Sequence, residues 1–147
     1  MPWCVVAGWS IDLFIGEQTR EHGDLEVEFL SRDFEVARAA LAGFGLFTAG
    51  SGNVRALRHD EAPPFENHQV WVLDVEAQLW RMDVMLEPGD ADTWIFRRDE
   101  SITAPRSFMV ERDVRGVPYL APHGSLLYKA KAAREKDEAD LESCLPA

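Results

Sequence analysis

The residues with the clearest chemical potential are two acids, Asp24 and Glu26, spaced two positions apart. They stand in the stretch 24–29, where acidic and apolar residues alternate, and this two-residue period predicts a strand with both acids on one face. Adjacent carboxylates repel each other unless a cation lies between them, and Mg²⁺ prefers such oxygen ligands. The plainer alternative is a solvated acidic face, because Glu28 continues the alternation.

A third acid, Asp83, lies much further along the chain within the apolar sequence LWRMDVMLEP. Burying a carboxylate among apolar neighbours is costly unless the carboxylate is paired, solvated or bound to a metal. On a strand beside the one that carries Asp24 and Glu26, this third carboxylate would complete a metal site.

Phosphate-binding signals precede the first two acids. Gly8 follows an apolar run and precedes Ser10, which is expected to begin a helix, and the free N–H groups of a helix N-terminus suit a phosphate. Arg20 and His22 come just before the acids and can meet phosphate oxygens. Taken alone, Gly8 is better explained as a strand-to-helix turn, and Arg20 and His22 are explained equally well as residues of a surface loop.

The elements that must position these residues follow from hydropathy patterns and from cap and turn residues. Ser10 and Gly16 are expected to begin and end a short helix. The predicted strands span 3–7, 25–29, 69–75, 79–86 and 93–97, with one or two weak strands within 46–57. The predicted helices span 11–15, 31–42, 124–134 and 137–144. This order predicts an α+β or mixed α/β fold rather than a doubly wound sheet.

Several blocks of the sequence resemble the nucleotidyltransferase superfamily that includes polymerase beta. Its members carry a Gly-[Gly/Ser] turn after the first strand, then an acid-hydrophobic-acid motif, and a third acid on a later strand. The chain is similar to the small antibiotic branch, the aminoglycoside 2″-adenylyltransferases and lincosamide nucleotidyltransferases. That branch reads Gly-Gly-Trp-Ala-x-Asp and then Thr-Arg-x-His-x-Asp-hydrophobic-Asp. The matching blocks are 7–12 (AGWSID), 19–26 (TREHGDLE), 80–84 (WRMDV) and 126–131 (LLYKAK) with Lys136-Asp137.

The resemblance implies a single α+β domain over 1–147 with the minimal nucleotidyltransferase core, a mixed sheet with helices packed mainly on one face. It also implies metal-assisted transfer of a nucleoside monophosphate, AMP from ATP or another NTP, to a hydroxyl of a small molecule such as an antibiotic. Asp24 and Glu26 would hold one or two Mg²⁺ ions, while Asp83 would share a metal and act as general base. Five residues would bind the nucleotide: Gly8, Ser10, Arg20, His22 and Lys129.

Two positions depart from the family pattern. Ala7 replaces the first glycine of the turn, and Glu26 replaces the usual second aspartate. The longer glutamate moves the carboxylate, and Mg²⁺ demands near-ideal octahedral geometry. These departures leave two alternatives open: a degenerate nucleotide-binding or interaction protein, and a toxin–antitoxin-type nucleotidyltransferase that modifies a protein or tRNA.

Other chemically notable residues have simpler structural interpretations. Asp12 is expected to be a first-turn helix acid, Asp137 a helix cap and Cys4 an inert buried thiol. Asp74 and Glu76 form a rival acid pair, but they fall beside a predicted turn, where exposed acids are common.

The tryptophans and the tail lysine also carry two interpretations each. Trp71, Trp80 and Trp94 are expected to pack in the core or between strands, with stacking on a base or sugar as the alternative for one of them. Lys129 lies in a predicted helix and is explained equally well as a solvated residue or as a phosphate contact.

Composition limits the classes of protein that fit. A chain of 147 residues, 46% hydrophobic and 28% charged, predicts one globular domain. Its net charge of −11 disfavours nucleic-acid binding. No apolar run reaches the roughly 20 residues of a membrane span, and the N-terminus lacks a signal-peptide pattern. Two distant cysteines favour a reduced, cytoplasmic protein, and the short chain leaves room for a homodimer that builds the acceptor pocket.

Overall fold

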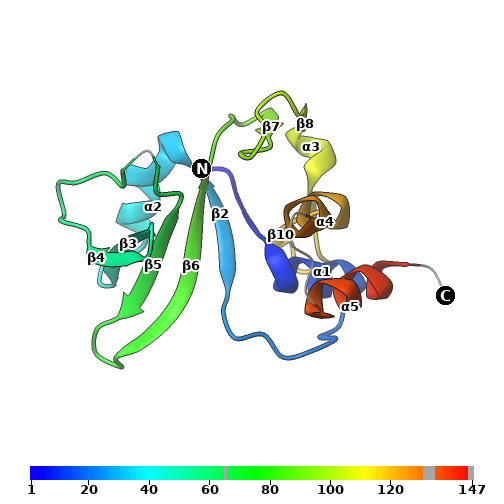
Figure 1. The fold of residues 1–147 in the computed structure, drawn as a ribbon, viewed down its shortest axis with the longest axis horizontal. Helices are drawn as coiled ribbons and strands as arrows, with labels where there is room; N and C mark the ends of the chain where they lie inside the picture. Colours follow the sequence, from blue (N-terminus) through cyan, green and yellow to red (C-terminus); the bar gives the residue numbers. More distant parts are fainter. Residues whose placement is uncertain (65, 131–134, 146–147) are drawn as a thin grey trace.

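A mixed sheet forms the centre of the molecule, seen here in a computed structural model that describes residues 1–64, 66–130 and 135–145 (Figure 1). Its strand order is β4-β3-β5-β6-β2-β1-β10-β9. The pairs β1–β10 and β2–β6 are parallel, and the other neighbours are antiparallel. The strands of this sheet are β1 Trp3–Val5, β2 Glu26–Leu30, β3 Gly45–Gly50, β4 Asn53–Ala56, β5 Gln69–Asp74, β6 Leu79–Glu87, β9 Val110–Arg112 and β10 Pro118–Leu120.

Helices and a small second sheet complete the described fold. The second sheet pairs β7 Thr93–Ile95 with β8 Thr103–Pro105. The helices are α1 Ala7–Ile15, the 3₁₀ turn η1 Ser31–Asp33 followed by α2 Phe34–Ala40, α3 Arg106–Met109, α4 Pro122–Lys129 and α5 Glu135–Cys144. Figure 1 shows α1, α4 and α5 grouped beyond the β10 side of the sheet, with α2 at the opposite end beside β3 and β5.

Each face of the sheet carries its own hydrophobic cluster, because successive side chains of a strand point to opposite faces. Val27 of β2 and Val84 of β6 face the larger cluster, to which α2 contributes Phe34. Cys4 of β1 belongs to the second cluster, where it meets residues of β7, α3 and β10. The same alternation turns the acids of β2 and β6 away from the larger cluster.

The extended hairpin β5–β6 contains one irregularity that bears on the site. Val72 pairs with Met82, but the next residue of β5, Leu73, pairs with Trp80. Arg81 is therefore an extra residue in β6, as in a β-bulge, and the two-residue alternation shifts at this point. As a result, Trp80 on the hairpin-tip side of Arg81 points to the same face of the sheet as Asp83.

The α+β fold class with a mixed sheet is confirmed, as are the strands at 25–29, 69–75 and 79–86. Gly16 ends α1 in the left-handed region, at φ +90°. The short strand β8 lies in a stretch expected to be loop, because three residues give too little periodicity to detect. The predicted helix segment 131–134 lies outside the described residues.

Two predicted helix starts were wrong. Helix α1 begins at Ala7 rather than after Ser10. The described part of α5 spans Glu135–Cys144, so Asp137 lies inside the helix and does not cap it. Among the described helices, none is long and apolar enough to cross a membrane.

Candidate active site

The three predicted catalytic acids lie on, or directly before, the neighbouring strands β2 and β6. The parallel pairing places Glu26 in register with Asp83, and register partners point to the same face of a sheet. Asp24 lies two residues before Glu26, just ahead of β2. The fold therefore joins acids from two distant segments on one face of the sheet.

Asp83 lies in a strongly perturbing environment. Burial, followed by the charges of Glu26 and Asp24, raises the pKa of Asp83 to about 7, and the nearby Trp71 side chain offsets only part of this rise. Gln69 Nε2 donates a hydrogen bond of 3.1 Å to Asp83 Oδ2. Asp83 Oδ1 is buried and has no hydrogen-bond partner within the described chain. A buried, unpaired carboxylate oxygen beside two further acids is the environment that a cation relieves.

These residues are of the right chemical type to bind a divalent ion, but their carboxylates are not already gathered around a single position. Three carboxylates are suitable ligands for Mg²⁺, which keeps further positions for water and phosphate. Across residues 1–64, 66–130 and 135–145, no group of three or more His, Cys, Asp or Glu side chains is already arranged to hold a metal.

The start of α1 forms a tight cradle around Gly8. A Cβ atom placed on Gly8 would lie 2.5 Å from His22 Nδ1 and 2.6 Å from Arg20 Nη2. Ala7, the position that departs from the family pattern, adopts a φ of +56°, in the left-handed region that favours glycine. Glycine therefore suits both positions: position 8 has no space for a Cβ atom, and position 7 has a backbone conformation that glycine adopts most easily.

Arg20 and Lys129, two predicted phosphate contacts, are held by acids of α5. Arg20 Nε and Nη2 donate to the two carboxylate oxygens of Asp140 at 3.0 and 3.1 Å. Lys129 Nζ donates to Asp137 at 2.7 Å and to Asp140 at 2.8 Å. Burial opposes ionisation of Asp140, but the hydrogen bonds from Arg20 and Lys129 outweigh it and lower the pKa of Asp140. Lys129 is thus neither a solvated residue nor an unpaired cation.

His22 is fixed by Asp12, which is a buried side chain. Asp12 Oδ2 lies 2.5 Å from His22 Nε2, and Asp12 Oδ1 accepts hydrogen bonds from the backbone and the hydroxyl of Thr19. Asp12 therefore joins α1 to the loop 19–24 that leads into the acids. Because α1 begins at Ala7, Asp12 lies in the second turn of the helix, and the first-turn position expected from the sequence was wrong.

Ser10 lines neither of the two cavities described below. It is fully buried, and its hydroxyl donates to the carbonyl oxygen of Ala7 at 2.7 Å and lies 2.6 Å from Ser125 Oγ. The contact of Ser10 with a phosphate stays a prediction, and the burial of its hydroxyl argues against it.

Two cavities border the acids and share the loop 22–24. The larger, of about 600 Å³, is lined by six of the predicted residues: Gly8, Arg20, His22, Asp24, Glu26 and Lys129. The smaller, of about 410 Å³, is lined by Asp83 together with His22, Asp24 and three tryptophans. Asp24 thus faces both cavities, whereas Glu26 lines the larger and Asp83 the smaller.

The floor of the larger cavity holds charged residues that the sequence patterns did not reveal. Glu28 is only 1% exposed and pairs with Arg106 at 3.2 Å, so the solvated acidic face suggested for it was wrong. Burial, followed by the charge of Glu87, raises the pKa of Glu28 to about 7. Glu87 accepts hydrogen bonds from Arg97 at 3.1 Å and from Tyr128 at 3.0 Å.

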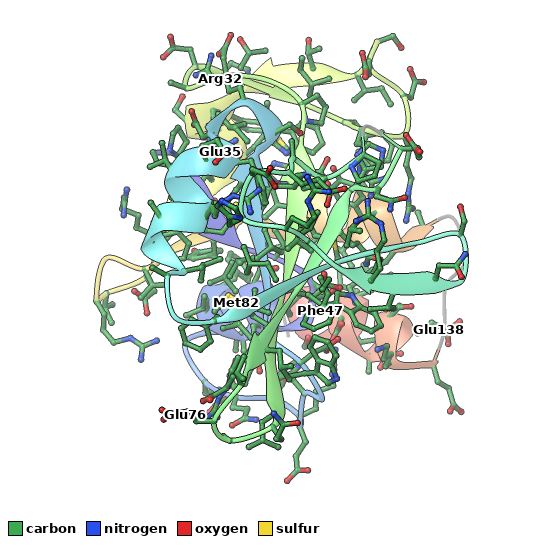
Figure 2. All side chains as sticks on the ribbon, turned by 90° about the vertical axis from the view of Figure 1, so that its left-hand side faces the viewer. Arg32, Glu35, Phe47, Glu76, Met82 and Glu138 are labelled. Atoms are coloured by element: carbon green, nitrogen blue, oxygen red, sulfur yellow. The ribbon has the colours of Figure 1, made fainter. Side chains whose placement is uncertain are left out.

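The rival acid pair serves the hairpin turn. Asp74 accepts hydrogen bonds from the backbone N–H of Ala77 and from Arg81. Figure 2 shows Glu76 at the tip of the β5–β6 hairpin. This position supports the turn interpretation of the pair over a metal site.

A mixed sheet with carboxylates on adjacent parallel strands, next to a glycine at the start of a helix, places the protein among the nucleotidyltransferases. The family model for aminoglycoside-2''-adenylyltransferase matches residues 1–143, and the chain belongs to this family. The crystal structure of the lincosamide antibiotic adenylyltransferase LnuA with lincomycin bound is similar in fold, with a TM-score of 0.63 and 16% identity. The match covers 97% of this chain and 84% of that chain. No curated protein sequence matches the chain.

Proposed function

We propose that this enzyme transfers a nucleoside monophosphate, AMP from ATP, to a hydroxyl of a small molecule of the aminoglycoside or lincosamide type in a Mg²⁺-dependent reaction. The observation that carries the proposal is the register of Glu26 with Asp83, with Asp24 beside them. Family membership supports the reaction class, and the geometry of the acids supports the chemistry.

Asp24, Glu26 and Asp83 are the residues that would hold the magnesium, and the unpaired, buried oxygen of Asp83 fits this role. When bound, Mg²⁺ would neutralise charge on the phosphate oxygens and so favour attack at phosphorus. The side chain of Glu26 is one methylene longer than that of the usual aspartate, so its carboxylate can reach an ion from a backbone position slightly further away.

Asp83 is the proposed general base. Its carboxylate lines the smaller cavity beside Asp24, so a hydroxyl bound there can donate its proton to Asp83. The hydroxyl oxygen of the acceptor forms a bond to the α-phosphorus of the nucleotide, and its proton goes to the Asp83 carboxylate. The bond between the α-phosphorus and the bridging oxygen breaks, and pyrophosphate leaves.

The larger cavity is the proposed nucleotide site. The N-terminus of α1 at Gly8 offers backbone N–H groups to phosphate oxygens, and Arg20 and Lys129 offer positive charge. Both cations are already paired with acids of α5, so the nucleotide must share them or replace an acid. Cytoplasmic localisation and a homodimer stay predictions from the sequence.

Pyrophosphate release provides the test. With ATP and Mg²⁺, we expect release that depends on an acceptor drawn from an aminoglycoside and lincosamide panel and that stops when EDTA removes the metal. Asp83→Asn should lower the rate about 10²–10⁴-fold, whereas Glu76→Gln, which changes an acid at the hairpin tip, should leave it unchanged. Metal-independent release, or full activity of Asp83→Asn, would contradict the proposal.

The same experiment separates the degenerate alternative. A protein that has lost catalysis would be stabilised by ATP and Mg²⁺ in a thermal shift measurement but would release no pyrophosphate with any acceptor. Glu26→Asp, which restores the usual family residue, would then be the variant to recover turnover.

A further inference from the structure

The smaller cavity has an aromatic wall next to the proposed base. Three of the five tryptophans of the chain line it: Trp9, Trp71 and Trp80. Trp71 of β5 is in register with Asp83 of β6, so indole and carboxylate lie side by side on one face of the sheet. We name this space, lined by the three tryptophans, Asp24 and Asp83, the aromatic cavity.

Trp80 reaches the aromatic cavity only because β6 contains an extra residue. In a regular strand, residues 80 and 83 point to opposite faces, and Trp80 would face the larger hydrophobic cluster. The irregularity at Arg81 turns Trp80 to the side of Asp83, where its ring meets that of Trp71 edge to face at 5.5 Å. Bulges of this kind re-aim side chains next to active sites.

The aromatic wall is organised but partly open. Phe47 of β3 supports the Trp80 ring edge to face at 5.1 Å, and Figure 2 shows Phe47 over the middle of the β5–β6 hairpin. Trp80 nevertheless keeps 53% of its surface exposed. A large ring that is held in place by its neighbours, yet left open to a cavity, is available to contact a ligand.

The charges of the aromatic cavity favour a cation. Asp24 and Asp83 contribute carboxylates. Arg81 also lines the cavity, but its guanidinium donates to Asp74 at 2.7 Å. His22 lines it as well and is paired with Asp12. Aromatic faces combined with acids suit a protonated amine, through cation–π attraction, and the apolar face of a hydroxylated ring.

We propose that the aromatic cavity is the acceptor subsite and that it binds a hydroxylated ring carrying a protonated amine, with the ring against Trp80 and Trp71 and a hydroxyl toward Asp83. The proposal rests on the proposed function, because it assigns the acceptor side of the same reaction. The nucleotide then occupies the larger cavity, and the two substrates meet at the shared loop 22–24. A volume of about 410 Å³ is suited to part of a multi-ring molecule.

Direct binding tests the subsite without requiring turnover. Isothermal titration calorimetry would measure tobramycin, lincomycin and neutral sucrose against the whole chain in the absence of nucleotide. We expect at least one of the two amine-bearing probes to bind and sucrose not to. Trp80→Leu should raise the Kd of the bound probe about tenfold, and Trp80→Phe, which keeps an aromatic face, should recover most of the affinity.

Trp3→Leu is the matched control, because Trp3 is an exposed strand tryptophan that lines neither cavity. It should leave the Kd unchanged. An unchanged Kd in Trp80→Leu, equal binding of sucrose, or no binding of either amine at 10 mM would overturn the subsite. In the transfer assay, Trp80→Leu should raise the KM for the acceptor and not that for ATP. If Trp80→Leu transfers with an unchanged acceptor KM, the subsite is refuted but the proposed function stands. If the amine binds to the aromatic cavity but no transfer occurs, the proposed function is refuted but the subsite stands.

Discussion

Replacing Ala7 with glycine is expected to stabilise the protein, although glycine usually weakens a helix. Ala7 is the first residue of α1 and adopts a φ of +56°. For an L-residue this left-handed conformation costs about 1–2 kcal/mol, because Cβ approaches the following carbonyl oxygen. Glycine has no Cβ and adopts the conformation without that cost.

Two smaller effects oppose this gain. Glycine gives the unfolded chain more conformational freedom, which costs about 0.4–1 kcal/mol. Removing the methyl group of a half-buried residue loses about 0.4 kcal/mol, half the value of a fully buried CH₂ group. From the middle of these ranges, Ala7→Gly should gain about 0.5 kcal/mol, which raises Tm by about 1–2 °C for a chain of this size.

Ala39→Gly is the matched control, because it makes the same chemical change inside α2, at an exposed position with ordinary helical backbone. It should cost about 1 kcal/mol, so the two variants should differ by about 1.5 kcal/mol in favour of Ala7→Gly. Urea unfolding and calorimetry would measure both. Equal destabilisation by the two substitutions would refute the assignment of strain to Ala7.

Three further variants address the proposed nucleotide and metal sites. Gly8→Ala puts a methyl group within 2.6 Å of Arg20 and should abolish the thermal shift caused by ATP and Mg²⁺, whereas an unchanged shift would place the phosphates elsewhere. Asp140→Asn leaves Arg20 without its charged partner and should lower the free energy of unfolding by about 3 kcal/mol above pH 4. Because the pKa of Asp140 is lowered in the folded protein, this difference from the unmodified protein should fade as the pH drops through the folded pKa. Unfolding measured as a function of pH would check this, and the exposed Glu142→Gln should show no such effect. Glu26→Asp should change the Mg²⁺ concentration needed for half-maximal pyrophosphate release, and an identical metal dependence would separate Glu26 from the metal.

Local patterns in the sequence were sufficient to predict the strands that carry the acids. The two-residue period around Asp24 and Glu26 predicts β2, and the apolar run around Asp83 predicts β6. Their pairing could not be derived from these patterns, because the register of distant strands depends on the whole sheet. The family resemblance supplied the expectation that the three acids meet.

The buried charges were missed for a related reason. Glu28 continues an alternating pattern that also fits a solvated face, and its partner Arg106 belongs to a helix of four residues that leaves no periodic signal. Asp140 lies in a highly charged helix typical of a solvated surface, yet it is only 2% exposed. The spacing of Asp137 and Asp140 on one helix face is the signal that could have identified a shared partner.

The extra residue in β6 separates two tasks along a single strand. Between Arg81 and the sheet centre, the ladder with β2 sets the position of the Asp83 carboxylate. Between Arg81 and the tip, the hairpin can exchange side chains or change length without shifting that ladder. If the proposed acceptor subsite is right, substitutions in the outer half of the hairpin can alter which molecules are accepted without moving Asp83 in the inner half.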